Sequence, residues 1–270
     1  KISTILLTII KKNNFETVIL PYEAQPFHQF SISQIKKNFK EIFIVGYMHS
    51  MLPPVPSDFI YRSGAPDLLL VHGESQSQVL KSKLDWPENK IYLIKSLRFR
   101  IENKNNLSNK IYLPYNLAKK SLLLDRFESF LISALPNSLP IFDIKNHSTM
   151  LDSSKHIKFK ESLKKIMEIY KNRFSTKPIN ENFSIFFGVT ASIFEALETG
   201  TKVIHICSEP LFQYFDDKIW PNLKTEKHDN GIYSYSLFSL GKYINFGTKN
   251  DTLQNALKNI NLKNRCLTKN

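Results

Sequence analysis

One stretch of the chain, residues 184–207, constrains the fold more than any other. Its short apolar run at residues 185–187 is typical of a strand buried on both faces of a parallel sheet. A helix is expected to open at residues 190–192 and to end at Gly200, because glycine readily adopts the left-handed conformation that stops a helix. Residues 203–206 then predict a second strand, so the stretch predicts one right-handed βαβ unit.

The turn between the first strand and the helix carries a possible ligand chemistry. Thr190 and Ser192 place hydroxyl groups beside backbone N–H groups that have no partner inside the helix. Such a helix N-terminus can bind phosphate. The same hydroxyl groups would also serve as ordinary N-caps. The residues by themselves leave both interpretations open.

The rest of the chain alternates predicted strands and helices, which is the pattern of an α/β fold with doubly wound parallel sheets. Strands are expected at residues 15–20, 41–47, 67–72, 90–94, 110–114, 140–144, 184–187, 203–206 and 243–246. Helices are expected at residues 31–39 (with Ser31 as the cap), 73–80, 125–135, 159–170, 190–199 and 252–260. Residues 5–10 fit either a helix or a strand, and residues 209–220 fit either a loop or an amphipathic helix.

A Pro-rich break near residue 137 divides this pattern as an interdomain linker would. We therefore expect two Rossmann-like domains, at residues 1–136 and 137–270. The chain begins with Lys1 rather than Met, which is compatible with further residues upstream.

Polar side chains follow several of the expected strands. They are Glu23, His49, His72, Glu74, His147, Thr190 and Ser192. Ligands of open α/β sheets bind beyond the carboxyl ends of the strands, so these side chains are expected on one side of the molecule. His205 alternates with apolar neighbours and is expected to be structural, as are the aromatic side chains of Phe186, Phe187, Tyr233 and Tyr235.

The formal net charge is +13, from 37 Lys and Arg against 24 Asp and Glu, which favours an anionic partner. The basic residues are scattered, with no run of five or more, which argues against nucleic acid. Two cysteines, Cys207 and Cys266, are too few for a disulfide framework or a zinc site and favour a reducing, cytoplasmic compartment. No apolar run is long enough to cross a bilayer.

Four short segments resemble motifs of nucleotide-sugar glycosyltransferases with two Rossmann-like domains that face a central cleft, the GT-B architecture. More narrowly, they resemble bacterial surface-polysaccharide transferases that handle Kdo and related nonulosonic acids. The segments are PYEAQP at 21–26, GYMHS at 46–50, IKNHST at 144–149 and FGVTASIFEALETGTKVI at 187–204. Met48 stands where these enzymes have Gln, and Ser148 stands where they have Pro.

The resemblance implies that the C-terminal domain binds the nucleotide-sugar donor and the N-terminal domain binds the acceptor. Lys145, His147, Thr190 and Ser192 would then hold the donor phosphate, and Glu195 would accept a hydrogen bond from a ribose hydroxyl. No metal ion or other cofactor is expected, because lysine and helix-end dipoles can neutralise a leaving phosphate. The nucleotide-sugar itself is a substrate, and the resemblance favours CMP as its nucleotide.

An inverting transfer needs a general base that deprotonates the acceptor hydroxyl, and Glu23 and His49 are the candidates. The implied acceptor is a surface polysaccharide or a lipid-linked glycan. The implied location is the cytoplasm, and peripheral contact with an anionic inner membrane is compatible with a lipid-linked acceptor.

Two other classes of protein remain open at this point. A sugar-nucleotide epimerase or hydrolase would share the donor site, because one fold serves several activities. A non-catalytic protein that binds nucleic acid or a membrane surface would be explained by the positive charge alone.

Overall fold

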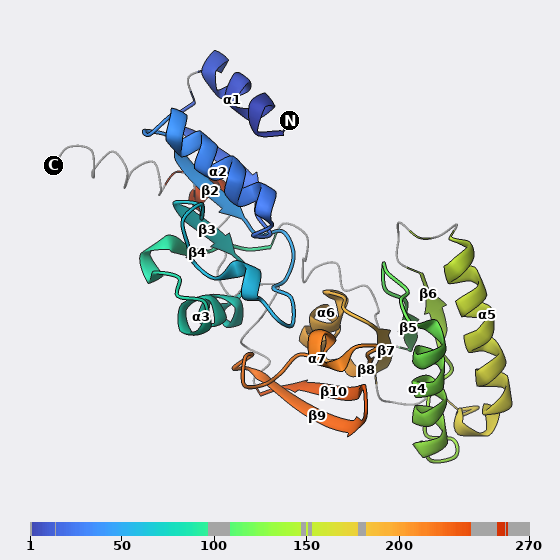
Figure 1. Cartoon of the computed structure of the whole chain (residues 1–270). Coiled ribbons are helices and arrows are strands. Elements are labelled where there is room, and N and C mark those ends of the chain that lie inside the picture. The colour runs from blue at the N-terminus through green and yellow to red at the C-terminus, as the bar shows by residue number, and fades with distance from the viewer. Residues whose placement is uncertain are drawn as a thin grey trace. The chain divides into compact units, whose positions relative to one another are not determined.

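The computed structural model describes residues 2–13, 15–96, 109–146, 150, 153–177, 182–238, 253–256 and 258. The fold is α/β, with one parallel and one mixed sheet (Figure 1). The chain forms two compact units. Unit 1 comprises Lys1–Leu52, Pro56–Ile101 and Gly241–Asn270, and unit 2 comprises Pro53–Val55 and Glu102–Leu240. Among the described helices, none combines the length and the apolar composition that crossing a bilayer requires.

Unit 1 is built on a four-stranded parallel sheet in the order β1-β2-β3-β4. The strands are β1 (Thr17–Pro21), β2 (Phe43–Tyr47), β3 (Leu68–Val71) and β4 (Ile91–Leu93). The helices are α1 (Ile2–Asn13), α2 (Pro26–Asn38) and α3 (Glu74–Lys83), with short 3₁₀ turns η1 (Ser57–Phe59) and η2 (Glu88–Lys90). All four residues of β3 are buried, as expected for a central strand of a parallel sheet.

The core of unit 1 contains a segment from the far end of the chain. Ala256 is fully buried against Val45, Leu70 and Ile94, and Leu253 packs against the same cluster. Residues 253–256 and 258 are helical, in agreement with the helix expected at 252–260. The last described residues therefore stabilise the unit in which the chain begins.

Unit 2 is built on a six-stranded sheet in the order β6-β5-β7-β8-β10-β9. The strands are β5 (Lys110–Tyr112), β6 (Asp143–Lys145), β7 (Phe183–Phe187), β8 (Lys202–Ile206), β9 (Leu223–Asp229) and β10 (Ile232–Leu237). The first four in the spatial order are parallel, and β10 and β9 add an antiparallel hairpin. The helices are α4 (Lys120–Ser133), α5 (Ser154–Ile169), α6 (Ser192–Glu198) and α7 (Pro210–Gln213), with a 3₁₀ turn η4 (Lys171–Arg173).

The two faces of this sheet are covered by different elements. On one face, Phe127 of α4 and Phe159 of α5 pack against Phe187, with ring centroids 5.9 and 5.5 Å away. Figure 1 shows α4 and α5 side by side over this part of the sheet. A second aromatic group contains Phe194 of α6 and Phe215, whose rings meet edge to face at 4.7 Å. Unit 2 therefore has a core of its own.

The division into units differs from the expected boundary at residue 137. β5 and α4, which were expected in the N-terminal domain, belong to unit 2, because β5 pairs with β6 on one side and β7 on the other. The Pro-rich segment is a connection inside unit 2, where Leu139 forms a β-bridge with Phe174.

Other expectations also need correction. The second sheet is mixed rather than parallel throughout, because β9 and β10 run antiparallel. α2 begins at Pro26 instead of being capped by Ser31, since proline fits the first turn of a helix. Within residues 209–220 only the four residues of α7 are helical. The strand expected at 243–246 lies outside the described residues.

Candidate functional site

The candidate catalytic residues of unit 1 lie at the carboxyl ends of two neighbouring strands. β1 pairs with β2 up to Pro21 and Tyr47, so the residues that follow these strands emerge together. His49 Nε2 lies 3.2 Å from Glu23 Oε1. Ser50 Oγ donates a hydrogen bond of 2.9 Å to the same carboxylate oxygen. The parallel pairing thus brings together two residues that are 26 positions apart in the chain.

This cluster can hold and transfer a proton. The carboxylate of Glu23 accepts the hydrogen bond of Ser50 and lies 3.2 Å from Nε2 of His49, so it favours one orientation of the His49 ring. Within the described residues, the second ring nitrogen of His49, Nδ1, has no hydrogen-bond partner. The side chains of Glu23 and His49 are about one-third and about one-half exposed, so a substrate can approach them. A carboxylate and an imidazole in contact are suitable groups for general base catalysis.

Two further histidines lie close enough to influence this cluster electrostatically. Burial lowers the pKa of His28, an effect that Glu23 opposes and His49 reinforces. Burial also lowers the pKa of His72 to about 4, partly offset by the backbone carbonyls of Met48 and Ile94. His72 is therefore neutral at pH 7, and burial favours the neutral form of His28.

Ser50 and His28 were not selected from the sequence, although both were visible in it. Ser50 ends the GYMHS segment, and His28 follows the PYEAQP segment after one residue. Their positions in two neighbouring motifs were the available signal. The contact of Ser50 with Glu23, and the nearness of His28 to it, depend on the path of the backbone beyond each strand, which the motifs do not specify.

The candidate donor-binding turn of unit 2 follows β7. The backbone N–H of Ser192 donates a hydrogen bond of 3.3 Å to Thr190 Oγ1, and α6 begins at Ser192. The hydroxyl of Thr190 therefore closes a local turn before α6, whereas the N-cap position is occupied by Ala191 and has no side-chain cap. Gly188 at the start of the turn has φ +61°, a conformation that favours glycine.

A series of buried hydrogen bonds connects this turn to strands β8 and β10. His205 Nε2 donates to the carbonyl oxygen of Gly188 at 2.7 Å, since a carbonyl can only accept. His205 Nδ1 therefore accepts from the hydroxyl of Tyr235 at 2.8 Å. The backbone N–H of Phe215 donates to the same hydroxyl at 3.1 Å. The structural role expected for His205 is confirmed, and its contact with Gly188 helps to position the turn.

His205 is expected to make the stability of the protein depend on pH. Burial lowers its pKa from 6.5 to about 4, so the unfolded chain binds a proton more readily between these values. Its contribution is present above pH 6.5 and is lost as the pH falls toward 4, by about 3 kcal/mol. Urea unfolding of the wild type and of His205→Asn between pH 7 and pH 4 measures this, and the variant should show a shallower dependence.

The exposed His228 provides the matched control for that experiment. Because His228 lies at the surface on β9, His228→Asn should keep the wild-type dependence of unfolding free energy on pH. If His205→Asn left the pH dependence of the unfolding free energy unchanged, the proposed role of His205 would be contradicted. His72 and His28 of unit 1, whose pKa values burial also lowers, are expected to contribute to the dependence that remains.

The other predicted donor residues have the following positions. Lys145 ends β6 beside Tyr112 of β5, and its ammonium group forms an ion pair of 2.6 Å with Asp143. This pairing lowers the pKa of Asp143. Glu195 of α6 lies near Tyr112 and contributes, after burial, to a raised pKa of that phenol. His147 lies outside the described residues.

Lys145, Tyr112 and the turn after β7 thus share one edge of the sheet, at the carboxyl ends of β6, β5 and β7. In the described part of the chain, no three His, Cys, Asp or Glu side chains lie together in a way that could hold a metal ion. The metal-independent reaction expected from the sequence therefore stays a prediction. Comparison of the chain with known protein families, with curated proteins and with solved structures gave no match.

Proposed function

We propose that this protein is a glycosyltransferase that moves a sugar from a nucleotide-sugar donor to a surface-polysaccharide or lipid-linked glycan acceptor. The observation that carries the proposal is the contact of Glu23 with His49 and Ser50 beyond a parallel sheet. In the proposed reaction this pair takes the proton of the acceptor hydroxyl as its oxygen attacks the anomeric carbon. The nucleotide phosphate leaves with the electrons of the broken bond.

The topology of unit 2 supports a donor site at its own strand ends. The chain leaves β5 through α4 toward β6, and it leaves β7 through α6 toward β8, on opposite sides. A crevice forms where such connections diverge, and ligands of open α/β sheets bind there. Thr190, Ser192 and Glu195 follow β7 at this point, and Lys145 ends the strand next to β5. To contact a phosphate, Lys145 would exchange its ion pair with Asp143 for the ligand.

The finer features of the proposal follow from the sequence resemblance. They are two Rossmann-like domains that face a central cleft, a CMP-linked donor, independence of metal ions, no nucleic-acid partner, and a cytoplasmic location.

Unit 1 adds support for peripheral contact with an anionic membrane. Its first two helices expose apolar side chains next to lysines, a combination that binds anionic lipid surfaces. The residues are Ile5, Ile9, Lys11, Lys12, Phe27 and Phe30.

A thermal-shift screen with CMP, CDP, UDP and GDP tests the donor site. One nucleotide, CMP by resemblance, is expected to raise the melting temperature by several degrees. At one hundred times its dissociation constant a ligand adds about 2.7 kcal/mol of stability, and each kcal/mol raises the melting temperature by about 2–4 °C in a chain of this size. Ser192→Ala should reduce the shift, because Ser192 is proposed to contact the phosphate.

Ser129→Ala is the matched control, because Ser129 is exposed in the middle of α4 and bonds only within its own helix. The rise in melting temperature that the nucleotide causes in this variant should equal that of the wild type. Equal shifts for Ser192→Ala and wild type would contradict the donor site. Product analysis then separates the activities, since a transferase needs an acceptor and an epimerase or hydrolase acts without one.

A further inference from the structure

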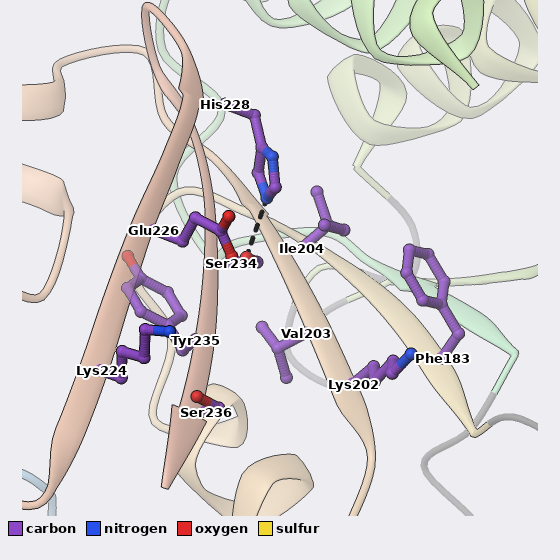
Figure 2. Close-up of a pocket in the computed structure, with 10 residues that line it drawn as sticks. All are labelled: Phe183, Lys202, Val203, Ile204, Lys224, Glu226, His228, Ser234, Tyr235 and Ser236. Atoms are coloured by element: carbon purple, nitrogen blue, oxygen red, sulfur yellow. Dashed lines mark hydrogen bonds between the residues drawn. The ribbon is translucent and has the colours of Figure 1, made fainter. Parts of the chain in front are cut away.

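The mixed sheet of unit 2 carries a hollow of about 310 Å³ away from the candidate donor site. Phe183 and Lys202, which line it, are the first residues of β7 and β8. The hollow therefore lies at the opposite end of these parallel strands from Thr190 and Ser192. Figure 2 shows its lining side chains, which come from β7, β8, β9 and β10. A volume of this size is at the lower end of the range for small-molecule sites.

The strand register places the polar side chains of the hollow on one face of the sheet. Ser236 of β10 is paired with Lys224 of β9, and Ser234 is paired with Glu226. Ser234 is also paired with Ile204 of β8. Residues opposite one another on adjacent strands point to the same face, and so do residues two apart on one strand. Two hydroxyls, an ammonium and a carboxylate thus surround an apolar side chain.

A β-bulge adds a histidine to this face. The pairing passes from Asp229 with Ile232 to Lys227 with Tyr233, so His228 is the extra residue of β9. His228 Nε2 lies 2.8 Å from Ser234 Oγ, within hydrogen-bond distance. Figure 2 shows this contact beside Glu226. Bulges redirect a side chain and are frequent beside binding sites, so the bulge gives the hollow a locally defined polar wall.

We propose that this hollow binds an acidic saccharide. The ammonium groups of Lys202 and Lys224 would attract the acid group of the sugar, and the carboxylate of Glu226 would accept hydrogen bonds from its hydroxyls. Phe183 and Ile204 supply apolar surface for the C–H face of a sugar ring. A simple inorganic anion would leave this apolar surface unused. The inference concerns binding alone and does not depend on the proposed transfer reaction.

Isothermal titration of the full chain with trigalacturonate, a charged trisaccharide, tests the proposal. Lys224→Gln is expected to weaken binding about fivefold, the effect of one exposed charge pair. Lys227→Gln is the matched control, because Lys227 lies on the same strand and is paired with Tyr233, on the other face from Lys224. It removes the same charge and should leave binding unchanged. Neutral maltotriose should bind more weakly than trigalacturonate.

Three results would overturn the inference: no binding of trigalacturonate, equal weakening by the two variants, or binding of maltotriose or phosphate as tightly as trigalacturonate. Both lysines are exposed, so the variants should fold as the wild type does. Glu23→Gln, which is expected to disable transfer, should bind trigalacturonate normally. Failure of the hollow and failure of the proposed reaction are therefore distinguished.

Discussion

Glu23→Gln is expected to lower acceptor-dependent turnover by about a hundredfold to ten-thousandfold, the usual contribution of a general base. The amide has nearly the same shape as the carboxylate but cannot take up the proton of the acceptor hydroxyl. Donor binding should be unaffected, because the candidate donor residues belong to unit 2 and Glu23 belongs to unit 1. Steady-state kinetics and the nucleotide-induced thermal shift, measured on the same variant, check both halves of the prediction.

Glu16→Gln is the matched control for this variant. Glu16 is exposed and immediately precedes β1, at the opposite end of the strand from Glu23. It should retain wild-type turnover. Near-wild-type turnover of Glu23→Gln would show that Glu23 is not the base.

Ser50 gives a graded version of the same experiment. Its hydroxyl donates a hydrogen bond of 2.9 Å to the carboxylate of Glu23. Hydrogen bonds to charged groups contribute about 1.5–3 kcal/mol. Ser50→Ala is therefore expected to reduce turnover by about tenfold or more. Ser50→Thr keeps a hydroxyl and should recover most of the loss. A purely structural effect would instead appear as a lower melting temperature in both variants.

The local units of the fold were predictable because their signals are local. Residues 184–207 form β7, α6 and β8 as expected, and Gly200 has the left-handed φ of +79° that ends the helix. Short apolar runs between turn residues suffice to identify such elements. The contact of Glu23 with His49 also follows from a local rule, since β1 and β2 are consecutive strands that pair with each other.

The hairpin of β9 and β10 had a turn signal, Asn230 followed by Gly231, but both of its strands were missed. β9 reads LKTEKHD, and six of its seven residues are partly or fully exposed. As the edge of the sheet it needs no buried alternation, and charged side chains on an edge oppose aggregation. Hydrophobic periodicity cannot identify a strand of this kind.

The contacts of Lys145 were missed for a different reason. Asp143 and Lys145 are two residues apart on β6 and point to the same face, which a correct strand assignment would have indicated. The strand expected at residues 140–144 ended one residue too early, which placed Lys145 in the following loop. The hollow on β7, β8, β9 and β10 depends on strand register and on a bulge, and neither is encoded in a single short segment.

The position of β5 provides the sharpest test of the fold. A fragment of residues 102–240 is expected to fold, whereas a fragment of residues 137–240 is expected to remain unfolded. The shorter fragment begins at the boundary that the Pro-rich segment suggested, and it lacks β5 and α4. β5 lies between β6 and β7, so its removal leaves β6 without a strand to pair with and exposes one edge of β7.

The loss of α4 removes a further part of the core. Leu123, Phe127 and Leu131 of α4 are buried against the same face of the sheet as Phe159 and Phe187. Each large buried side chain contributes about 2–5 kcal/mol, and domains have only about 5–15 kcal/mol in total, so three losses exceed what the unit can tolerate. Circular dichroism and urea unfolding compare the two fragments. Cooperative unfolding of the 137–240 fragment would contradict the central place of β5, because a sheet without its second strand would then be sufficient for folding.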